Sequence, residues 1–258
     1  MPKLNANLSM MFNEVNFLQR FDAAAKAGFK GVEFLFPYAF ASDQIGEKLS
    51  KNKLEMVLFN MPPGNWDAGD RGMACDPART GEFQDNVGKA LEYAVALECK
   101  RVHAMAGLRP RGASEDRMRQ TYIVNLQFAG KELAKHGIAL LIEAINTRDI
   151  PGFYLNYSDQ ALGIMDDAKV PNLQFQYDIY HMQIMEGDLA PTIEKNLAQI
   201  GHMQLADTPG RHEPGTGEIN YSFLLPFIDR IGYQGWIGCE YKPAGKTVDG
   251  LGWTKPYL

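Results

Sequence analysis

Polar side chains inside otherwise apolar segments are the first candidates for chemistry in this sequence. The stretch QYDIYHM places Asp178 in what reads as a buried strand and follows it, three residues later, with His181. Other apolar segments carry Glu143, Gln204 or Glu240 at or near their carboxyl ends. An isolated carboxylate costs several kcal/mol to bury. We therefore expect these groups to contact one another or a cation.

These residue types form an oxygen-only ligand set. Three carboxylates and one amide oxygen suit Mg²⁺ or Mn²⁺, whereas zinc prefers nitrogen and sulfur ligands. We interpret Glu143, Asp178, Gln204 and Glu240 as ligands of one divalent cation. For each residue alone, an ordinary surface or loop-capping role is the alternative. Their recurrence at successive segments favours the metal.

Further polar residues are candidates for binding a substrate. His181 lies just beyond the segment that holds Asp178, where it could donate a hydrogen bond to a substrate oxygen. Arg211 and Lys242 follow two of the apolar segments and could bind a substrate carboxylate, the arginine through paired hydrogen bonds and the lysine as a point charge. Each could equally be a solvated surface charge. His103 could line the same pocket, and a satisfied core histidine is the equal alternative.

The segment 62–80 is too long for a plain strand-to-helix turn and is rich in Gly, Pro and Asp. This pattern is typical of an active-site lid, and it offers Trp66 and Arg71 as candidate pocket walls. Glu33 interrupts another apolar segment. A lone carboxylate there caps a loop or pairs with a neighbouring cation at least as readily as it acts in catalysis.

The elements that must position these residues follow a repeated pattern. A basic helix end, a glycine and an apolar strand containing glutamate recur in KAGFKGVEFLF, KHGIALLIEAI and RIGYQGWIGCEYK. Apolar segments alternate with residues at helical spacing, which predicts an α/β fold, a single (β/α)8 TIM barrel with its chemistry at the carboxyl ends of the strands. An open doubly wound sheet is the rival, but no GxGxxG turn follows the first strand. The expected strands cover residues 3–9, 31–36, 54–60, 99–106, 138–145, 173–180, 201–206 and 235–241.

Composition narrows the class of partner. The 258 residues, 45% of them hydrophobic, suit one barrel domain over residues 1–258. A net charge of −5 gives no field that would attract nucleic acid or an anionic membrane. The three widely spaced cysteines and the lack of an apolar leader predict a reducing, cytoplasmic location. A small metabolite is the expected partner.

Long segments of the chain resemble a known family. From ANLSMMF through GVEFLFPY, LIEAIN, QYDIYHMQ and HEPGTGEINY to GCEYKP and GLGW, the sequence is similar to the xylose-isomerase-like barrels of sugar isomerases and epimerases, and within them to the hydroxypyruvate isomerase branch. The resemblance implies acid–base proton transfer by Glu143 and Glu240 through a metal-stabilised enediolate, on a 2-oxo acid. It implies the same four metal ligands, and a substrate contact for His181 and for Arg211.

One departure and several alternatives follow from this resemblance. Related ketose epimerases carry a histidine where this chain has Gln204, and an amide is a weaker ligand, so obligatory metal dependence is left open. A 2-oxo-tetronate isomerase, a ketose epimerase and a non-catalytic metabolite-binding barrel are the alternatives, and a homo-oligomer is compatible with the family. The endonuclease branch needs more histidine ligands and a basic face, whereas this chain has five histidines and a net charge of −5.

Overall fold

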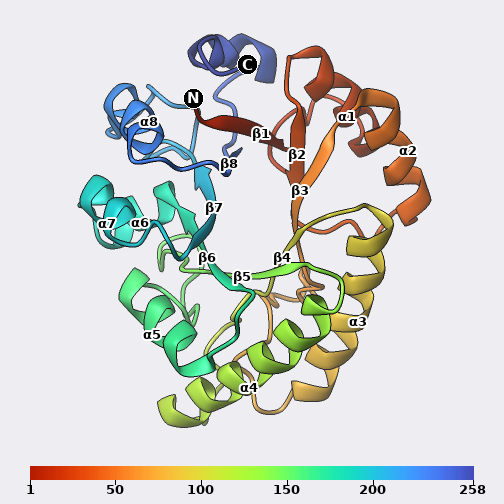
Figure 1. Cartoon of the computed structure of the whole chain (residues 1–258), viewed down its shortest axis with the longest axis vertical. Helices are drawn as coiled ribbons and strands as arrows, with labels where there is room; N and C mark the ends of the chain where they lie inside the picture. The colour runs from red at the N-terminus through yellow and green to blue at the C-terminus, as the bar shows by residue number, and fades with distance from the viewer.

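The chain forms a closed barrel of eight parallel strands in sequence order (Figure 1). The structure is a computed structural model that describes residues 1–258. The strands are β1 (Lys3–Asn7), β2 (Gly31–Phe34), β3 (Glu55–Asn60), β4 (Arg101–His103), β5 (Ala139–Glu143), β6 (Leu173–Asp178), β7 (Ile200–Leu205) and β8 (Trp236–Cys239). The predicted TIM barrel is confirmed, and each observed strand overlaps its predicted range.

Helices surround the ring of strands, as Figure 1 shows in a view along the barrel. They are α1 (Phe17–Lys26), α2 (Ser42–Asn52), α3 (Thr80–Ala96), α4 (Glu115–Ala134), α5 (Ser158–Ala168), α6 (Ile179–Met185), α7 (Leu189–Lys195) and α8 (Tyr221–Arg230), followed by the 3₁₀ helix η1 (Thr247–Thr254). No helix combines the length and the apolar character that crossing a membrane would require.

The apolar residues of the strands and helices form one large core that joins the barrel to its helices. In α4, for example, Tyr122, Leu126, Ala129 and Leu133 are fully buried, as their helical spacing predicts. Strands of this kind are covered on both faces, which explains their near-continuous apolar sequences. This packing fixes where each strand ends, and therefore where the residues at its carboxyl end lie.

The carboxyl half of the barrel interior is polar. Glu33 of β2 contacts His202 of β7, although β1 and β8 separate these strands in the sheet. Side chains of non-adjacent strands meet only across the inside of a closed barrel. The core beneath the site is therefore built from hydrogen-bonded polar groups as well as from apolar side chains.

Candidate active site

Asp178 ends β6 and begins α6. Its Oδ1 accepts hydrogen bonds from the backbone N–H groups of Tyr180 (2.8 Å) and His181 (3.4 Å), so this oxygen caps the helix. Its other oxygen, Oδ2, is buried without a hydrogen-bond donor. The nearest groups to this oxygen are His181 at 3.5 Å and the Arg211 guanidinium at 3.8 Å, so it stays available to a cation or a ligand.

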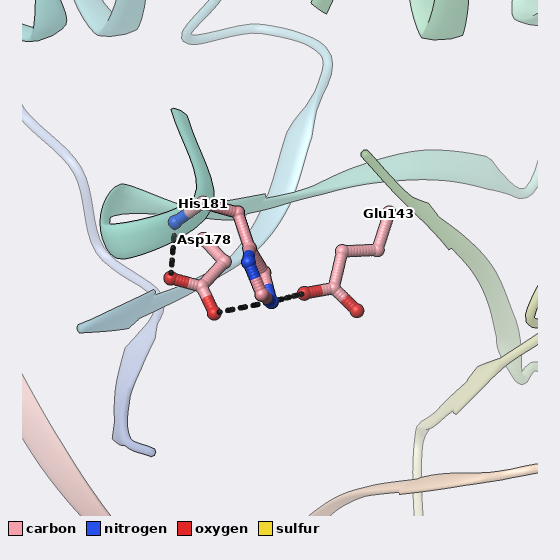
Figure 2. A group of neighbouring side chains, drawn as sticks. All are labelled: Glu143, Asp178 and His181. Carbon is pink, nitrogen blue, oxygen red and sulfur yellow. Dashed lines mark hydrogen bonds and ion pairs between the residues drawn. The ribbon is translucent and has the colours of Figure 1, made fainter. Parts of the chain in front are cut away.

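Glu143, at the end of β5, faces Asp178 across the imidazole of His181 (Figure 2). The Nε2 atom of His181 is 3.7 Å from Glu143 Oε1 and 3.5 Å from Asp178 Oδ2. On the other side, His103 Nδ1 is 3.6 Å from Glu143 Oε2. The Glu143 carboxylate is buried, yet none of these contacts is a close hydrogen bond.

Glu240, just beyond β8, is held more tightly. Arg211 donates to its Oε1 at 3.0 Å, and Gln204 donates to its Oε2 in a short contact. Arg211 also lies 3.2 Å from Asp149 and 3.8 Å from Asp178. One guanidinium therefore compensates three carboxylates, which leaves little of its charge free for a substrate.

Gln204 connects Glu240 to a second buried carboxylate, Glu33. The Nε2 atom of Gln204 donates to both groups, at 2.8 Å for Glu33, and its Oε1 accepts from Gln176 at 2.6 Å. Glu33 itself also accepts hydrogen bonds from three further side chains at 2.8–3.1 Å. These donors are Asn5, Asn7 and His202.

A cavity of about 700 Å³ opens over these groups at the carboxyl end of the barrel. Glu143, Glu240 and His181 line its floor side, and Trp66 and Arg71 of the segment 62–80 line its wall. The Arg71 guanidinium lies 4.0 Å from the centre of the Trp66 ring, and it donates to two backbone carbonyls. Lys242 is exposed at the same cavity, and neither Arg71 nor Lys242 forms an ion pair.

Burial and mutual repulsion dominate the electrostatics of the site. Burial, followed by the charges of Glu240 and Asp178, holds the pKa of Glu143 well above its usual value. Burial raises the pKa of Asp178 to about 6 and that of Glu240 to about 8, although the charge of Arg211 opposes both shifts. A divalent cation would relieve this repulsion.

The histidines of the site are neutral at physiological pH. Burial lowers the pKa of His103 to about 3, with a further contribution from His202. Burial and the charge of Arg211 also hold the pKa of His181 well below its usual value. Neither ring can therefore balance the carboxylates, and Arg211 is the one cation that contacts them.

The donor set fits a metal in part. Glu143, Asp178 and His181 each offer an atom, and these atoms lie within 4.8 Å of one another. The free Oδ2 of Asp178 and the weakly bound carboxylate of Glu143 are suited to a hard divalent cation. Gln204 turns its amino group toward Glu240 and its oxygen toward Gln176, so its role as a ligand stays a prediction.

Comparison with known proteins identifies the family to which the chain belongs. A family model described as xylose isomerase-like TIM barrel matches residues 21–257. The chain belongs to this family. Within it, the chain is 50% identical to a 2-oxo-tetronate isomerase of Cupriavidus necator, over 100% of this chain and 99% of that protein. It is also 50% identical to a hydroxypyruvate isomerase of Escherichia coli, over the full length of both.

Solved structures of other proteins share this fold. A structure described as an AP endonuclease, family 2, from Brucella melitensis superposes with a TM-score of 0.98 at 50% identity, covering 100% of this chain and 99% of that one. The 3-keto-D-glucoside 4-epimerase of Escherichia coli superposes with a TM-score of 0.84 at 19% identity, covering 99% of each chain. At that identity, the second likeness concerns the fold alone.

The structure brings the predicted site residues of this family member together. Arg71, Glu143, His181, Arg211, Glu240 and Lys242 line the cavity. The other three contact members of that lining: Asp178 lies beside His181, Gln204 beside Glu240, and His103 beside Glu143. Their catalytic, metal-binding and substrate-binding roles stay predictions.

Sequence reasoning missed several buried polar residues in and around the site of this xylose isomerase-like barrel. These are Asn5, Asn7, Asn60, Asn146, Gln176 and His202. A signal for several of them was present, because polar residues occupy every second position in NAN, QFQYD and HMQ. Alternate residues of a strand share one face, and here that face is the barrel interior.

Proposed function

We propose that this chain is an isomerase that interconverts hydroxypyruvate and tartronate semialdehyde (2-hydroxy-3-oxopropanoate). The observation that carries the proposal is the pair Glu143 and Glu240, which reach one cavity from strands on different sides of the barrel and have raised pKa values. The relatives at 50% identity, a hydroxypyruvate isomerase and a 2-oxo-tetronate isomerase, support the same class of reaction.

The reaction moves one hydrogen from C3 of hydroxypyruvate to C2, and one proton from the C3 hydroxyl to the C2 oxygen. A base must take the carbon-bound proton, and an acid must return a proton to the neighbouring carbon. Glu143 and Glu240 can divide these tasks, because carboxyl groups with raised pKa values supply both ionised and protonated forms near neutral pH. Closure of the segment 62–80 would exclude water from the intermediate.

We propose Mg²⁺ or Mn²⁺ as the cofactor, with Glu143, Asp178, Gln204 and Glu240 as the ligand set. Such an ion, when bound, would polarise the substrate carbonyl as a Lewis acid. The free Oδ2 of Asp178 supports this assignment. Ligation by Gln204 requires its amide oxygen to turn from Gln176 toward the cation.

The substrate carboxylate is assigned to Arg71 and Lys242. Both line the cavity without an ion pair, whereas Arg211 is already surrounded by Asp149, Asp178 and Glu240. An anionic substrate would thus find two uncompensated cations at the rim and a carboxylate cluster at the floor. With its carboxylate held at these cations, a 2-oxo acid would present C2 and C3 to the carboxylate cluster.

A four-carbon 2-oxo acid is the second candidate substrate, because relatives of equal identity carry both names. Purified protein with Mg²⁺ or Mn²⁺ should be offered hydroxypyruvate, 2-oxo-tetronate and an uncharged ketose in parallel. Turnover that is fastest with hydroxypyruvate supports the proposal. Faster turnover of 2-oxo-tetronate would reassign the substrate, and turnover of the ketose alone would favour an epimerase.

Other activities have less support. The five histidines and the net charge of −5 do not suit DNA cleavage, whatever the description of the Brucella melitensis relative. A non-catalytic metabolite-binding barrel would be supported by metal binding without turnover of any of these substrates. A single domain, a cytoplasmic location and a homo-oligomer stay predictions.

A further inference from the structure

Asn146 has a side-chain orientation that its own backbone neighbours fix. It is fully buried and follows β5 three residues after Glu143. Its Oδ1 accepts hydrogen bonds from the backbone N–H groups of Arg148 (3.0 Å) and Asp149 (2.7 Å). Because two donors hold the oxygen, the amino group must be the end that faces His181. The Nδ2 of Asn146 lies 2.6 Å from His181 Nδ1.

This contact determines which ring nitrogen of His181 carries hydrogen. The backbone N–H of Asn146 also points at His181 Nδ1, at 3.4 Å. Two donors and no acceptor surround Nδ1, so Nδ1 must be the unprotonated nitrogen that accepts. A neutral imidazole with an accepting Nδ1 carries its hydrogen on Nε2.

The Nε2–H group points into the reacting part of the site. It lies between Glu143 and Asp178 (Figure 2), and His181 lines the cavity. A nitrogen that carries hydrogen has no lone pair for a metal. Distance alone would allow His181 to join Glu143 and Asp178 as a third ligand, but this protonation pattern excludes it and leaves only oxygen ligands.

We propose that Asn146 is a positioning residue that holds His181 as the Nε2–H imidazole, a hydrogen-bond donor to the substrate oxygen beside Glu143 and Asp178 and not a metal ligand. The substrate contact rests on the proposed isomerase function, whereas the protonation pattern does not. A neutral donor at this point stabilises negative charge that develops on a substrate oxygen during proton transfer. Removing one such donor typically lowers kcat by about 10²–10³-fold.

The first test is a long-range ¹H–¹⁵N correlation spectrum of ligand-free protein labelled with ¹⁵N-histidine, recorded at neutral and mildly alkaline pH. The signals of His181 are assigned by their loss in His181→Gln. We expect an unprotonated Nδ1 and a protonated Nε2. A protonated Nδ1, in either a neutral or a cationic ring, would overturn the proposal. This result stands whether or not the protein isomerises hydroxypyruvate.

The second test reverses the contact. Asn146→Asp keeps an oxygen for the two backbone donors and turns a second oxygen toward His181, so Nδ1 must then carry hydrogen. We expect the His181 spectrum to change accordingly and kcat to fall about 10²–10³-fold, with a smaller change in KM. Thr147→Asp adds the same charge at the adjacent exposed position and should change neither.

Two outcomes of the second test count against the proposal. Asn146→Asp could keep the wild-type spectrum, or it could change the spectrum and leave kcat as in wild type. If that variant fails to fold, Asn146→Ala removes the amino donor to His181 together with the oxygen that accepts from Arg148 and Asp149, and a wild-type His181 spectrum with wild-type kcat would overturn the positioning role. Failure of the wild-type protein to turn over any 2-oxo acid would count against the proposed function instead.

Discussion

The two glutamates proposed for proton transfer differ in how they are held. Both oxygens of Glu240 accept hydrogen bonds, from Arg211 and Gln204, whereas Glu143 has only longer contacts with two histidines. A carboxylate without close donors can move toward a substrate more freely. Glu240, which Arg211 and Gln204 hold, keeps one position relative to the substrate.

Replacing either glutamate by glutamine should abolish its acid–base role and keep its shape. We expect Glu143→Gln and Glu240→Gln each to lower kcat by about 10²–10⁴-fold, because that is the usual contribution of a general acid or base. The measurement is turnover of hydroxypyruvate in deuterated solvent, with deuterium at the product carbon read by NMR and folding checked by circular dichroism. Glu218→Gln, an exposed glutamate between β7 and α8, is the control. Near-wild-type turnover in a folded variant would remove that glutamate from the mechanism.

The assignment of the substrate carboxylate makes a separate prediction at the rim. Arg71→Met and Lys242→Met should each raise KM for hydroxypyruvate about 10–100-fold, because a hydrogen bond to a charged group contributes about 1.5–3 kcal/mol. Arg71→Lys should recover part of the loss, since it restores the charge but not the planar stacking on Trp66. Lys131→Met, on the exposed face of α4, is the matched control. Unchanged KM in both test variants would place the anion site elsewhere.

At the scale of elements, Gly238 of β8 leaves space for the buried hydrogen-bond network that links Glu33, Gln204 and Glu240. A Cβ at Gly238 would lie 2.3 Å from Glu33 Oε1 and 2.4 Å from Oε2. Glu33 in turn holds the amino group of Gln204, which contacts Glu240. The close approach of β8 to the β2 side chain is therefore a condition for the geometry of the site.

Gly238→Ala should displace Glu33 and destabilise the protein by about 1–3 kcal/mol through overpacking. It should also lower kcat, because Gln204 loses the partner that orients it toward Glu240. Urea unfolding and steady-state kinetics measure the two effects. Gly88→Ala in α3, where an added Cβ meets nothing within 4 Å, is expected to be neutral or stabilising. Wild-type kinetics in Gly238→Ala would show that the network does not set the geometry of Glu240.

The same elements explain what the sequence could predict. The alternation of apolar strands and amphipathic helices is local, so the eight strands and the ends that carry Glu143, Asp178 and Glu240 could be placed from it. The partners of Glu33 could not, because His202 lies 169 positions away and meets it only after the barrel closes. The direction of the Gln204 amide also depends on Gln176 and Glu33, which no periodicity identifies.

At the scale of the whole molecule, the buried carboxylates of the site repel one another when ionised, so both pH and a bound metal should change the stability of the folded protein. A carboxyl group whose pKa is higher in the folded than in the unfolded state favours folding while it is protonated. That contribution is present below its ordinary pKa and is lost as pH rises through the folded value. The pKa values are about 6 for Asp178 and about 8 for Glu240, against ordinary values of 3.8 and 4.5.

The buried histidines limit stability from the acidic side. His103 and His181 have pKa values below the ordinary 6.5, so folding is disfavoured when pH falls under 6.5 and the unfolded chain takes up protons. The lowered pKa of Glu33, for which its hydrogen-bond donors and His202 outweigh burial, adds a loss of stability below its ordinary 4.5. Below pH 6.5 the histidines and the carboxyl groups with raised pKa values act in opposite directions, whereas above it only the raised carboxyl pKa values act, so metal-free protein should become less stable as pH rises above 6.5.

We expect the Tm of metal-free protein, kept in EDTA, to fall as pH rises from about 6.5 to about 8.5, through the raised pKa of Glu240. A change of one pKa unit corresponds to about 1.4 kcal/mol, and 1 kcal/mol shifts Tm by about 2–4 °C in a chain of this size. Excess Mg²⁺ or Mn²⁺ should raise Tm most at the alkaline end, where the ligands are ionised and binding adds stability. Differential scanning calorimetry across this pH range, with and without metal, measures both effects.

Glu240→Gln should flatten the metal-free dependence of Tm on pH because it removes the ionisation of Glu240, whose pKa is raised, whereas Glu218→Gln should leave that dependence unchanged. Two results would contradict repulsion between buried carboxylates that a bound cation relieves. One is a metal-free Tm that rises across this pH range, and the other is an increase in Tm on adding metal that is equal at both ends of the range.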